Sequence, residues 1–259
     1  MKLLFIGDIV GAVGRHIVAQ RLPYYKSLYE VDFVVANGEN AAHGKGLTKK
    51  VVNQLLASGI DVITLGNHSY SKKDVYDLDT ALPLCFPGNM VGRFQDRHTV
   101  VLEKGDIKFA ISSVYGAVFM DNVDFSPFIM MDRILKQYPD HAHIIDFHGE
   151  ATAEKQAFMH YYKDQVSAVL GTHTHVQTVD ADIFNGCAYI SDVGMCGGYI
   201  SILGRDLEEA LDMIVHQKQT HYKPASSPAL FSGVMIDFDE NMRAVSIERI
   251  YEKPSENLR

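Results

Sequence analysis

The sequence predicts an α/β fold in which mixed β-sheets are covered by helices. Short apolar runs alternate with helical patterns along most of the chain, and the first five predicted elements come in βαβαβ order. The C-terminal region ends instead in two long strands joined by a turn, which predicts an antiparallel pair. With 259 residues, of which 47% are apolar, the chain can bury a full core, and we expect one domain over residues 1–259.

The first half of the chain supplies the βαβαβ unit and a hairpin. Thr48 is expected to cap the second helix at its start, and Gly59 to follow its end. Lys104-Gly105-Asp106 separates two apolar runs and predicts a hairpin turn. The predicted strands are residues 2–7, 33–36, 62–65, 99–103 and 107–112, and the predicted helices are 13–29 and 48–58.

The second half resumes the alternation of helices and strands before it closes in the antiparallel pair. The turn of that pair is predicted at Asp239-Glu240-Asn241. The predicted helices are residues 126–137, 153–162 and 206–217, and the predicted strands are 144–147, 168–170, 188–190, 229–238 and 244–251.

Charge and cysteine content restrict the class of protein. A formal net charge of −8 argues against binding duplex nucleic acid through a broad basic face, because such binding neutralises phosphates. Cys85, Cys187 and Cys196 form neither a CxxC pair nor an even set, which favours reduced thiols in a cytoplasmic protein. Asp8 interrupts the apolar N-terminal run, and no apolar stretch approaches the roughly 20 residues that cross a bilayer, so we expect a soluble protein without membrane contact.

Polar residues follow the predicted strands at the points where the strands end. In an open α/β sheet these ends and the loops after them face one crevice, so residues distant in sequence converge there. Each residue alone has a structural explanation: a helix cap for Asp8, an Asx-turn for Asn40, a core histidine for His148. The full set is Asp8, Glu39, Asn40, Asn67, His68, His148, His173 and His175.

The residue types in this set predict a metal site. Imidazole nitrogens and carboxylate and amide oxygens suit zinc, manganese or iron better than an all-oxygen calcium cage. The i, i+2 spacing of His173 and His175 would put both rings on one side of an extended segment. Because one metal rarely needs seven protein ligands and a carboxylate can bridge two ions, the count indicates a dinuclear site.

The ordered motifs resemble the metallophosphoesterase superfamily, and within it the YmdB family. The superfamily motifs are GD at residues 7–8, GNH at 66–68, His148 in DFHGEATAEK, and GTHTH at 171–175. NGENAAHGKG at 37–46 and DVGM at 192–195 are similar to YmdB members, and the likeness covers nearly the whole chain. The resemblance implies a four-layer α-β-β-α sandwich with two mixed sheets, a two-metal centre at the strand ends, and hydrolysis of phosphate esters.

The resemblance also implies a role for each ligand. Most superfamily members carry a histidine two residues after the first aspartate, where this chain has Val10, and Asn40 resembles the replacement used by the YmdB family. Glu39 and Asn40 can ligate together only if the backbone leaves extended geometry, a freedom expected from Gly38. Iron or manganese is the expected metal, with zinc or magnesium left open. Glu39 would bridge the ions, with Asp8, Asn40 and His175 completing one and Asn67, His148 and His173 the other.

The expected mechanism has a bridging hydroxide attacking phosphorus while His68 protonates the leaving oxygen as general acid. The alternative is that His68 only donates a hydrogen bond to the phosphate. After GNH, Ser69-Tyr70-Ser71 departs from the Thr-Trp-Asp-like continuation of the family. The resemblance therefore does not predict the shape of the substrate entrance or the residues that support His68.

Substrate contacts are expected from three further residues. His43 and Lys45 lie in the glycine-rich loop close to Glu39. Tyr199 lies in residues 192–205, a second glycine-rich segment expected to form a mobile rim where a base could stack.

The sequence therefore predicts a cytoplasmic dinuclear phosphodiesterase that hydrolyses small phosphodiesters. By resemblance the substrates are cyclic nucleotides, with 2′,3′-cyclic nucleotides preferred. One alternative is a phosphomonoesterase or nucleotidase with the same metals. Another is a regulatory interaction protein whose metal site is mainly structural, and a regulatory protein partner or a homo-oligomer stays open.

Overall fold

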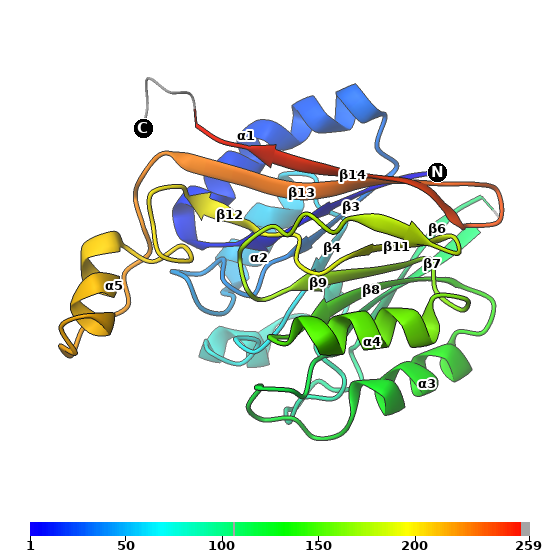
Figure 1. Ribbon diagram of the computed structural model, residues 1–259, viewed down its shortest axis with the longest axis horizontal. Helices are drawn as coiled ribbons and strands as arrows, with labels where there is room; N and C mark the ends of the chain where they lie inside the picture. Colours follow the sequence, from blue (N-terminus) through cyan, green and yellow to red (C-terminus); the bar gives the residue numbers. More distant parts are fainter. Residues whose placement is uncertain (106, 255–259) are drawn as a thin grey trace.

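The computed structural model describes residues 1–105 and 107–254, whose strands form two mixed sheets (Figure 1). The larger sheet has eight strands in the order β2-β12-β13-β1-β3-β4-β5, with β14 beside β13. Pairing is parallel from β1 through β3 and β4 to β5, and antiparallel between β1 and β13. Its strands are β1 (Lys2–Ile6), β2 (Asp8–Ile9), β3 (Phe33–Asn37), β4 (Val62–Thr64), β5 (Leu84–Cys85), β12 (Met195–Gly198), β13 (Ala229–Phe238) and β14 (Ala244–Glu252).

The smaller sheet has six strands in the order β10-β11-β9-β8-β7-β6. Its four central strands are parallel, and the two edge strands pair antiparallel. The strands are β6 (Thr99–Lys104), β7 (Ile107–Tyr115), β8 (Ala142–His148), β9 (Ala168–Thr172), β10 (Asp182–Phe184) and β11 (Cys187–Ile190).

Helices cover the outer face of each sheet. The α1 and α2 helices pack on the larger sheet, and α3 and α4 pack on the smaller one (Figure 1). The α5 helix projects beside the sheets, at the left of the view. The helices are α1 (Gly11–Tyr29), α2 (Lys49–Ala57), α3 (Pro127–Gln137), α4 (Thr152–Tyr162) and α5 (Leu207–Ile214), with a 3₁₀ turn η1 (Lys73–Asp77).

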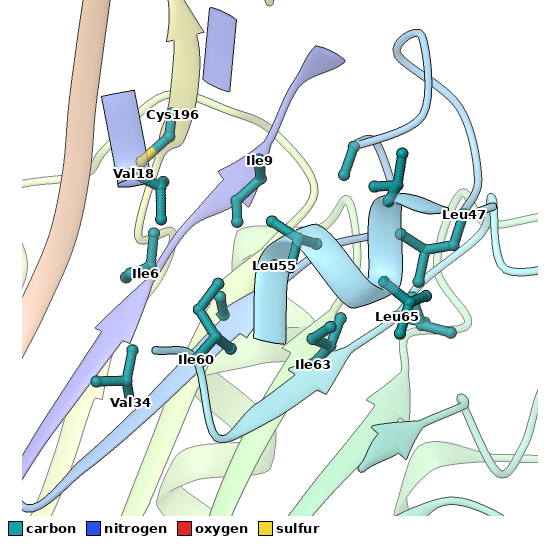
Figure 2. Packing of buried hydrophobic residues seen from close by; sticks show 14 of the residues in the cluster. Ile6, Ile9, Val18, Val34, Leu47, Leu55, Ile60, Ile63, Leu65 and Cys196 are labelled. Carbon is teal, nitrogen blue, oxygen red and sulfur yellow. The ribbon is translucent and has the colours of Figure 1, made fainter. Parts of the chain in front are cut away.

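The period of two in β1 creates two of the apolar layers. Leu3 and Phe5 point between the sheets, and Leu4 and Ile6 point to the α1 and α2 side. Figure 2 shows this outer layer, in which Leu55 of α2 packs near the strands. A third cluster packs α3 and α4 on the smaller sheet. The result is the expected α-β-β-α order, and burying each large aliphatic side chain contributes roughly 1.5–3 kcal/mol.

The helix starts follow the local sequence. Thr48 Oγ1 accepts a hydrogen bond from Val51 N at 3.3 Å, as predicted for a cap, and Gly59 follows the helix with φ of +101°. Ser126 and Asp206 cap α3 and α5 in the same way. The α5 helix ends at Ile214, three residues before the predicted end, and the prediction of a turn at Asp106 lies outside the described residues.

The expectation that residues 192–205 form a mobile rim is wrong for the first part of that segment. Residues 195–198 form β12, a buried strand that pairs with β2 and β13. A Cβ on Gly14 would lie 2.2 Å from Cys196 O, so this glycine lets α1 pack directly on β12. Glycine therefore serves close packing here, and the strand that it supports begins beside Asp8.

Cys85, Cys187 and Cys196 are all buried and unpaired, as predicted. Burial raises the pKa of Cys196 to about 12, which keeps its thiol protonated. Among the described residues, no helix is long and apolar enough to cross a membrane.

Candidate metal centre

The predicted site residues meet at one rim, where the parallel strands of both sheets end. Asp8 begins β2, Glu39 and Asn40 follow β3, and Asn67 and His68 follow β4. His148 is the last residue of β8, and His173 and His175 follow β9. Asp8, Glu39, Asn40 and His148 are at most 3% exposed, so their polar atoms have to be satisfied within the site.

Glu39 and Asn40 point into the same site because the chain leaves the strand at Gly38 and turns. Ala41 N donates to Gly38 O at 3.0 Å, and Glu39 N donates to Asn37 Oδ1 at 3.1 Å. Gly38 was expected to supply backbone freedom at this turn, but its φ does not lie in the left-handed region. A Cβ at this position would lie 2.6 Å from Ile63 Cγ2, so glycine is needed for the close approach of the chain to β4.

One group of ligand atoms surrounds His148 Nε2. Asn67 Oδ1 lies 2.8 Å from this nitrogen, His173 Nδ1 lies 3.1 Å away, and Glu39 Oε1 lies 3.3 Å away. The ligand atoms of Glu39, His148 and His173 all lie within 4.8 Å of one another, a spacing that could hold a metal ion.

A second group surrounds the side-chain amide of Asn40. Its Nδ2 lies 3.1 Å from His175 Nε2, 3.1 Å from Glu39 Oε1 and 3.3 Å from Asp8 Oδ1. The nitrogen and oxygen of an amide exchange places when the side chain turns over, which would bring Oδ1 to the same point. Glu39 Oε1 belongs to both groups and lies between them.

His173 and His175 do not lie on one side of an extended segment, as their spacing had predicted. Neither residue is extended, because β9 ends at Thr172 and their φ angles are 102° and 67°. The two rings therefore face different groups: His173 lies beside His148, and His175 lies beside Asn40. Positive φ is uncommon for residues other than glycine, and such strain concentrates at functional sites.

Each of the three histidines has its second ring nitrogen held by an oxygen atom. His175 Nδ1 donates to Leu203 O at 3.0 Å, and His173 Nε2 lies 3.2 Å from Glu150 Oε2. His148 Nδ1 lies 2.8 Å from Thr172 Oγ1. Second nitrogens held in this way are typical of metal-binding histidines, since the first nitrogen keeps its lone pair for the ion.

Burial and charge in the site favour a cation. Burial disfavours the charged form of His148, but the carboxylates of Glu39 and Asp8 outweigh it and raise its pKa to about 9. Burial also works against the carboxylate of Asp8, yet His175 and His148 hold the pKa of Asp8 well below its ordinary value. Burial and the neighbouring His148 lower the pKa of His173 to about 4, so this ring is neutral at pH 7. The ionised carboxylate of Asp8 and the neutral ring of His173 fit a divalent metal, and His148 would have to lose its proton to join them, because a metal-binding imidazole is neutral.

His68 lies at the edge of this set. Its backbone N donates to Glu39 Oε2 at 2.9 Å, and its Nε2 lies 3.3 Å from Asn67 Nδ2. Burial lowers the pKa of His68, with Glu39 acting in the opposite direction. Of the unusual Ser69-Tyr70-Ser71 segment, Ser71 Oγ lies 3.5 Å from His68 Nδ1, and the Tyr70 ring stacks on Phe86. The segment therefore closes the turn and supports His68.

Two cavities open beside the site and share Asn67, His68 and His173. The smaller, of about 130 Å³, also contacts Glu39, Asn40 and His175 and is closed by Gly44, Leu203, Arg205 and Tyr222. The larger, of about 330 Å³, extends to Tyr115, Phe119, Met120, Asp121 and Asn122.

None of the three residues expected to contact substrate, His43, Lys45 and Tyr199, lines either of these two cavities. His43 is exposed and lines neither, and Tyr199, whose N donates to Pro228 O, lines neither. Lys45 Nζ lies 5.4 Å from the centre of the Tyr222 ring, so it approaches the smaller cavity through that residue. Arg205 and Tyr222 themselves were missed, because nothing in their sequence spacing links them to the strand ends.

Two buried supports of the site were not predicted from the sequence. Asp146 accepts hydrogen bonds from Asn37, Thr64 and Thr172 in the centre of the smaller sheet. Lys155 donates to Thr172 O at 2.9 Å and pairs with Asp192, whose Oδ2 accepts from Thr174 N. A charged residue inside each of two apolar patterns, Asp146 in a strand and Lys155 in a helix, was the available signal.

The sandwich of two mixed sheets, with histidines, carboxylates and amides at its strand ends, defines a metallophosphoesterase-like phosphatase or phosphodiesterase. The chain belongs to the YmdB-like family, whose model, described as "YmdB-like protein", matches residues 4–250.

Similar proteins agree with this assignment. The chain is 40% identical over 255 residues to a 2′,3′-cyclic-nucleotide 2′-phosphodiesterase of Bacillus subtilis, covering 96% of each chain. A crystal structure of a Mycoplasma pneumoniae phosphatase superposes with a TM-score of 0.91 at 33% identity, covering 97% of this chain and 93% of that one. A hypothetical protein from Thermus thermophilus gives 0.90 at 36%, covering 97% and 99%. The chain is thus a hydrolase of the phosphodiesterase and phosphatase type.

Proposed function

We propose that the chain is a metal-dependent phosphodiesterase of a single domain that hydrolyses cyclic nucleotides and prefers 2′,3′-cyclic substrates. The observation that carries this proposal is the inward direction of one ring nitrogen each of His148, His173 and His175 beside His68, at the point where two cavities meet. The 2′,3′-cyclic-nucleotide 2′-phosphodiesterase of Bacillus subtilis, at 40% identity, supports the choice of substrate.

Seven side chains would hold two ions, with iron or manganese favoured over zinc or magnesium. Glu39 would bridge, because its Oε1 lies between the two groups of ligand atoms. Asp8, Asn40 and His175 would hold one ion, and Asn67, His148 and His173 the other. When bound, such ions supply positive charge for the phosphate and make a water molecule more acidic.

His68 would act on the leaving oxygen. It borders both cavities, and its backbone is fixed by the hydrogen bond to Glu39 Oε2, which holds the ring at the edge of the site. A phosphate anion in the neighbouring space would favour the protonated ring, because an opposite charge stabilises imidazolium. The proton would then pass from His68 to the ribose oxygen as its bond to phosphorus breaks.

The test is a substrate panel with protein loaded separately with Mn²⁺ or Fe²⁺. Nucleoside 2′,3′-cyclic phosphates, 3′,5′-cyclic phosphates and nucleoside monophosphates would be incubated at equal concentration and the products separated by chromatography. We expect the 2′,3′-cyclic substrates to open fastest, giving the nucleoside 3′-phosphate without release of inorganic phosphate. Faster release of inorganic phosphate from the monophosphates would overturn the proposal in favour of a phosphomonoesterase.

A further inference from the structure

The larger cavity borders the candidate metal site directly, because Asn67 and His173, two of the proposed ligands, line it together with His68. Its far wall is the segment between β7 and α3, which supplies Phe119, Met120, Asp121 and Asn122. Its volume of about 330 Å³ falls in the range of roughly 300–1,000 Å³ that small-molecule sites occupy. A group bound there would lie directly beside His68.

Phe119 is the prominent member of this wall. Its side chain is 86% exposed, the largest value among the exposed large hydrophobic residues of the described chain. Its φ of 62° lies in the left-handed region, which is an outlier for a bulky side chain. Strain of this kind persists only where the surrounding structure holds it, and it concentrates at ligand sites.

Both ends of the segment are held by hydrogen bonds to the side chains of Glu154 and Asn89. At its start, Ala117 N and Val118 N both donate to the carboxylate of Glu154 at 3.0–3.1 Å. Asn89 Nδ2 links the two ends, because it donates to Tyr115 O at the start and to Phe125 O at the end, at 2.6 and 3.1 Å. The exposed ring of Phe119 is therefore presented from a fixed backbone, which lowers the entropy cost of binding against it.

The charge of the larger cavity favours a nucleobase over a second phosphate group. Of the described residues that line it, Asp121 is the acidic one and none is lysine or arginine. A second phosphate would be repelled by this carboxylate, whereas the N–H groups of a nucleobase would be attracted to it. The smaller cavity differs, because Arg205 contributes to its lining.

From these observations we infer that the larger cavity binds the nucleobase of the substrate, with Phe119 as a stacking platform and Asp121 as an acceptor for base N–H groups. The inference rests on the proposed phosphodiesterase function, since His68 and the metal ligands would hold the phosphate between the two cavities. An aromatic face accepts any base, while the carboxylate favours bases with an exocyclic amine, such as cytosine over uracil.

The experiment compares two substrates that undergo the same ring opening. One is cytidine 2′,3′-cyclic phosphate, and the other is 1-O-methylribose 2,3-cyclic phosphate, which lacks the base. We expect Phe119→Ala to lower kcat/KM for the nucleotide roughly 5- to 140-fold, the range that corresponds to lost base stacking, and to leave the base-free substrate unchanged. Phe119→Tyr should retain the wild-type values, because a tyrosine ring also stacks.

The controls separate a failed subsite from a failed function. Val118→Ala changes an exposed neighbour that does not line the cavity, and it should leave both substrates unaffected. Asp121→Asn should reduce the preference for cytidine over uridine 2′,3′-cyclic phosphate. Equal effects of Phe119→Ala on the two substrates, or none on the nucleotide, would overturn the inference. A wild-type protein inactive on both would instead refute the proposed function.

Discussion

Thr172 Oγ1 lies 2.8 Å from His148 Nδ1 and holds the ring so that its other nitrogen, Nε2, faces the candidate metal centre. The hydroxyl also lies 2.6 Å from Asp146 Oδ1. Burial raises the pKa of Asp146 to about 6, so at pH 7 it is ionised and can only accept, and Thr172 gives its proton to it. The threonine oxygen must then accept from His148 Nδ1–H, so Nε2 is the nitrogen that points at Asn67, His173 and Glu39 and that would bind a metal after losing its own proton.

Thr172→Val should weaken metal binding without removing a ligand. Valine keeps the shape of the side chain but neither accepts from His148 nor donates to Asp146. Loss of such a supporting hydrogen bond typically costs 10- to 100-fold in metal affinity. The measurement is a Mn²⁺ titration by calorimetry, with Thr172→Ser as the control that retains the hydroxyl. An unchanged affinity in the valine variant would show that the ring is oriented by other contacts.

Metal affinity should rise with pH between about 7 and 9. In the metal-free protein the pKa of His148 is raised to about 9, so the ring is protonated below that pH. A ligand imidazole is neutral, so binding displaces this proton, and affinity should increase about tenfold per pH unit until the curve flattens near pH 9. Calorimetry in buffers of different ionisation enthalpy would count the protons released. A flat profile across this range would contradict the protonated resting state.

The raised pKa of His148 also predicts how the stability of the metal-free protein changes with pH. The folded pKa of His148 lies above the unfolded value of about 6.5, so its stabilising contribution is complete below pH 6.5 and is lost as pH rises through about 9. Thermal unfolding of chelator-treated protein between pH 6.5 and 9 measures this loss, and added Mn²⁺ should reduce it. If the melting temperature of the metal-free protein rises over this window, the raised pKa of His148 is contradicted. The exception is an equal rise in the His148→Asn variant, which would show that other groups cause it.

Much of the fold and the rim of the site could be predicted from the sequence, because period-two strands and amphipathic helices are local patterns. The short strands β2 and β12 could not, since their pairing depends on how closely Gly14 lets a helix approach Cys196. The geometry of the GTHTH segment was also inaccessible. Its histidines adopt positive φ because buried groups hold the loop, and a residue pattern does not report such long-range contacts.

The buried pair of Lys155 and Asp192 is one of those contacts. Lys155 should be sensitive to substitution, because its removal leaves Asp192 buried without its cation. Lys155→Met should cost about 3–5 kcal/mol of unfolding free energy, the range measured when a buried pair loses one partner. Denaturant unfolding measures the loss. The double variant Lys155→Met with Asp192→Asn should recover part of it, since the uncompensated charge is gone. Equal stability of wild type and Lys155→Met would show that the pair contributes nothing net.

His68 should affect substrates according to how much their leaving group needs a proton. Replacement by alanine removes the proton donor but none of the seven proposed ligands, so metal content should be retained. For a cyclic nucleotide, whose ribose oxygen leaves poorly, the rate should fall by roughly 10²–10⁴-fold, the usual contribution of general acid catalysis. A nitrophenyl phosphodiester releases a stable phenolate and hardly needs the proton, so its hydrolysis should fall much less. The two substrates would be compared in wild type and His68→Ala at matched metal content. Equal losses on both would assign His68 to holding the phosphate, because a hydrogen bond to phosphate serves either leaving group alike.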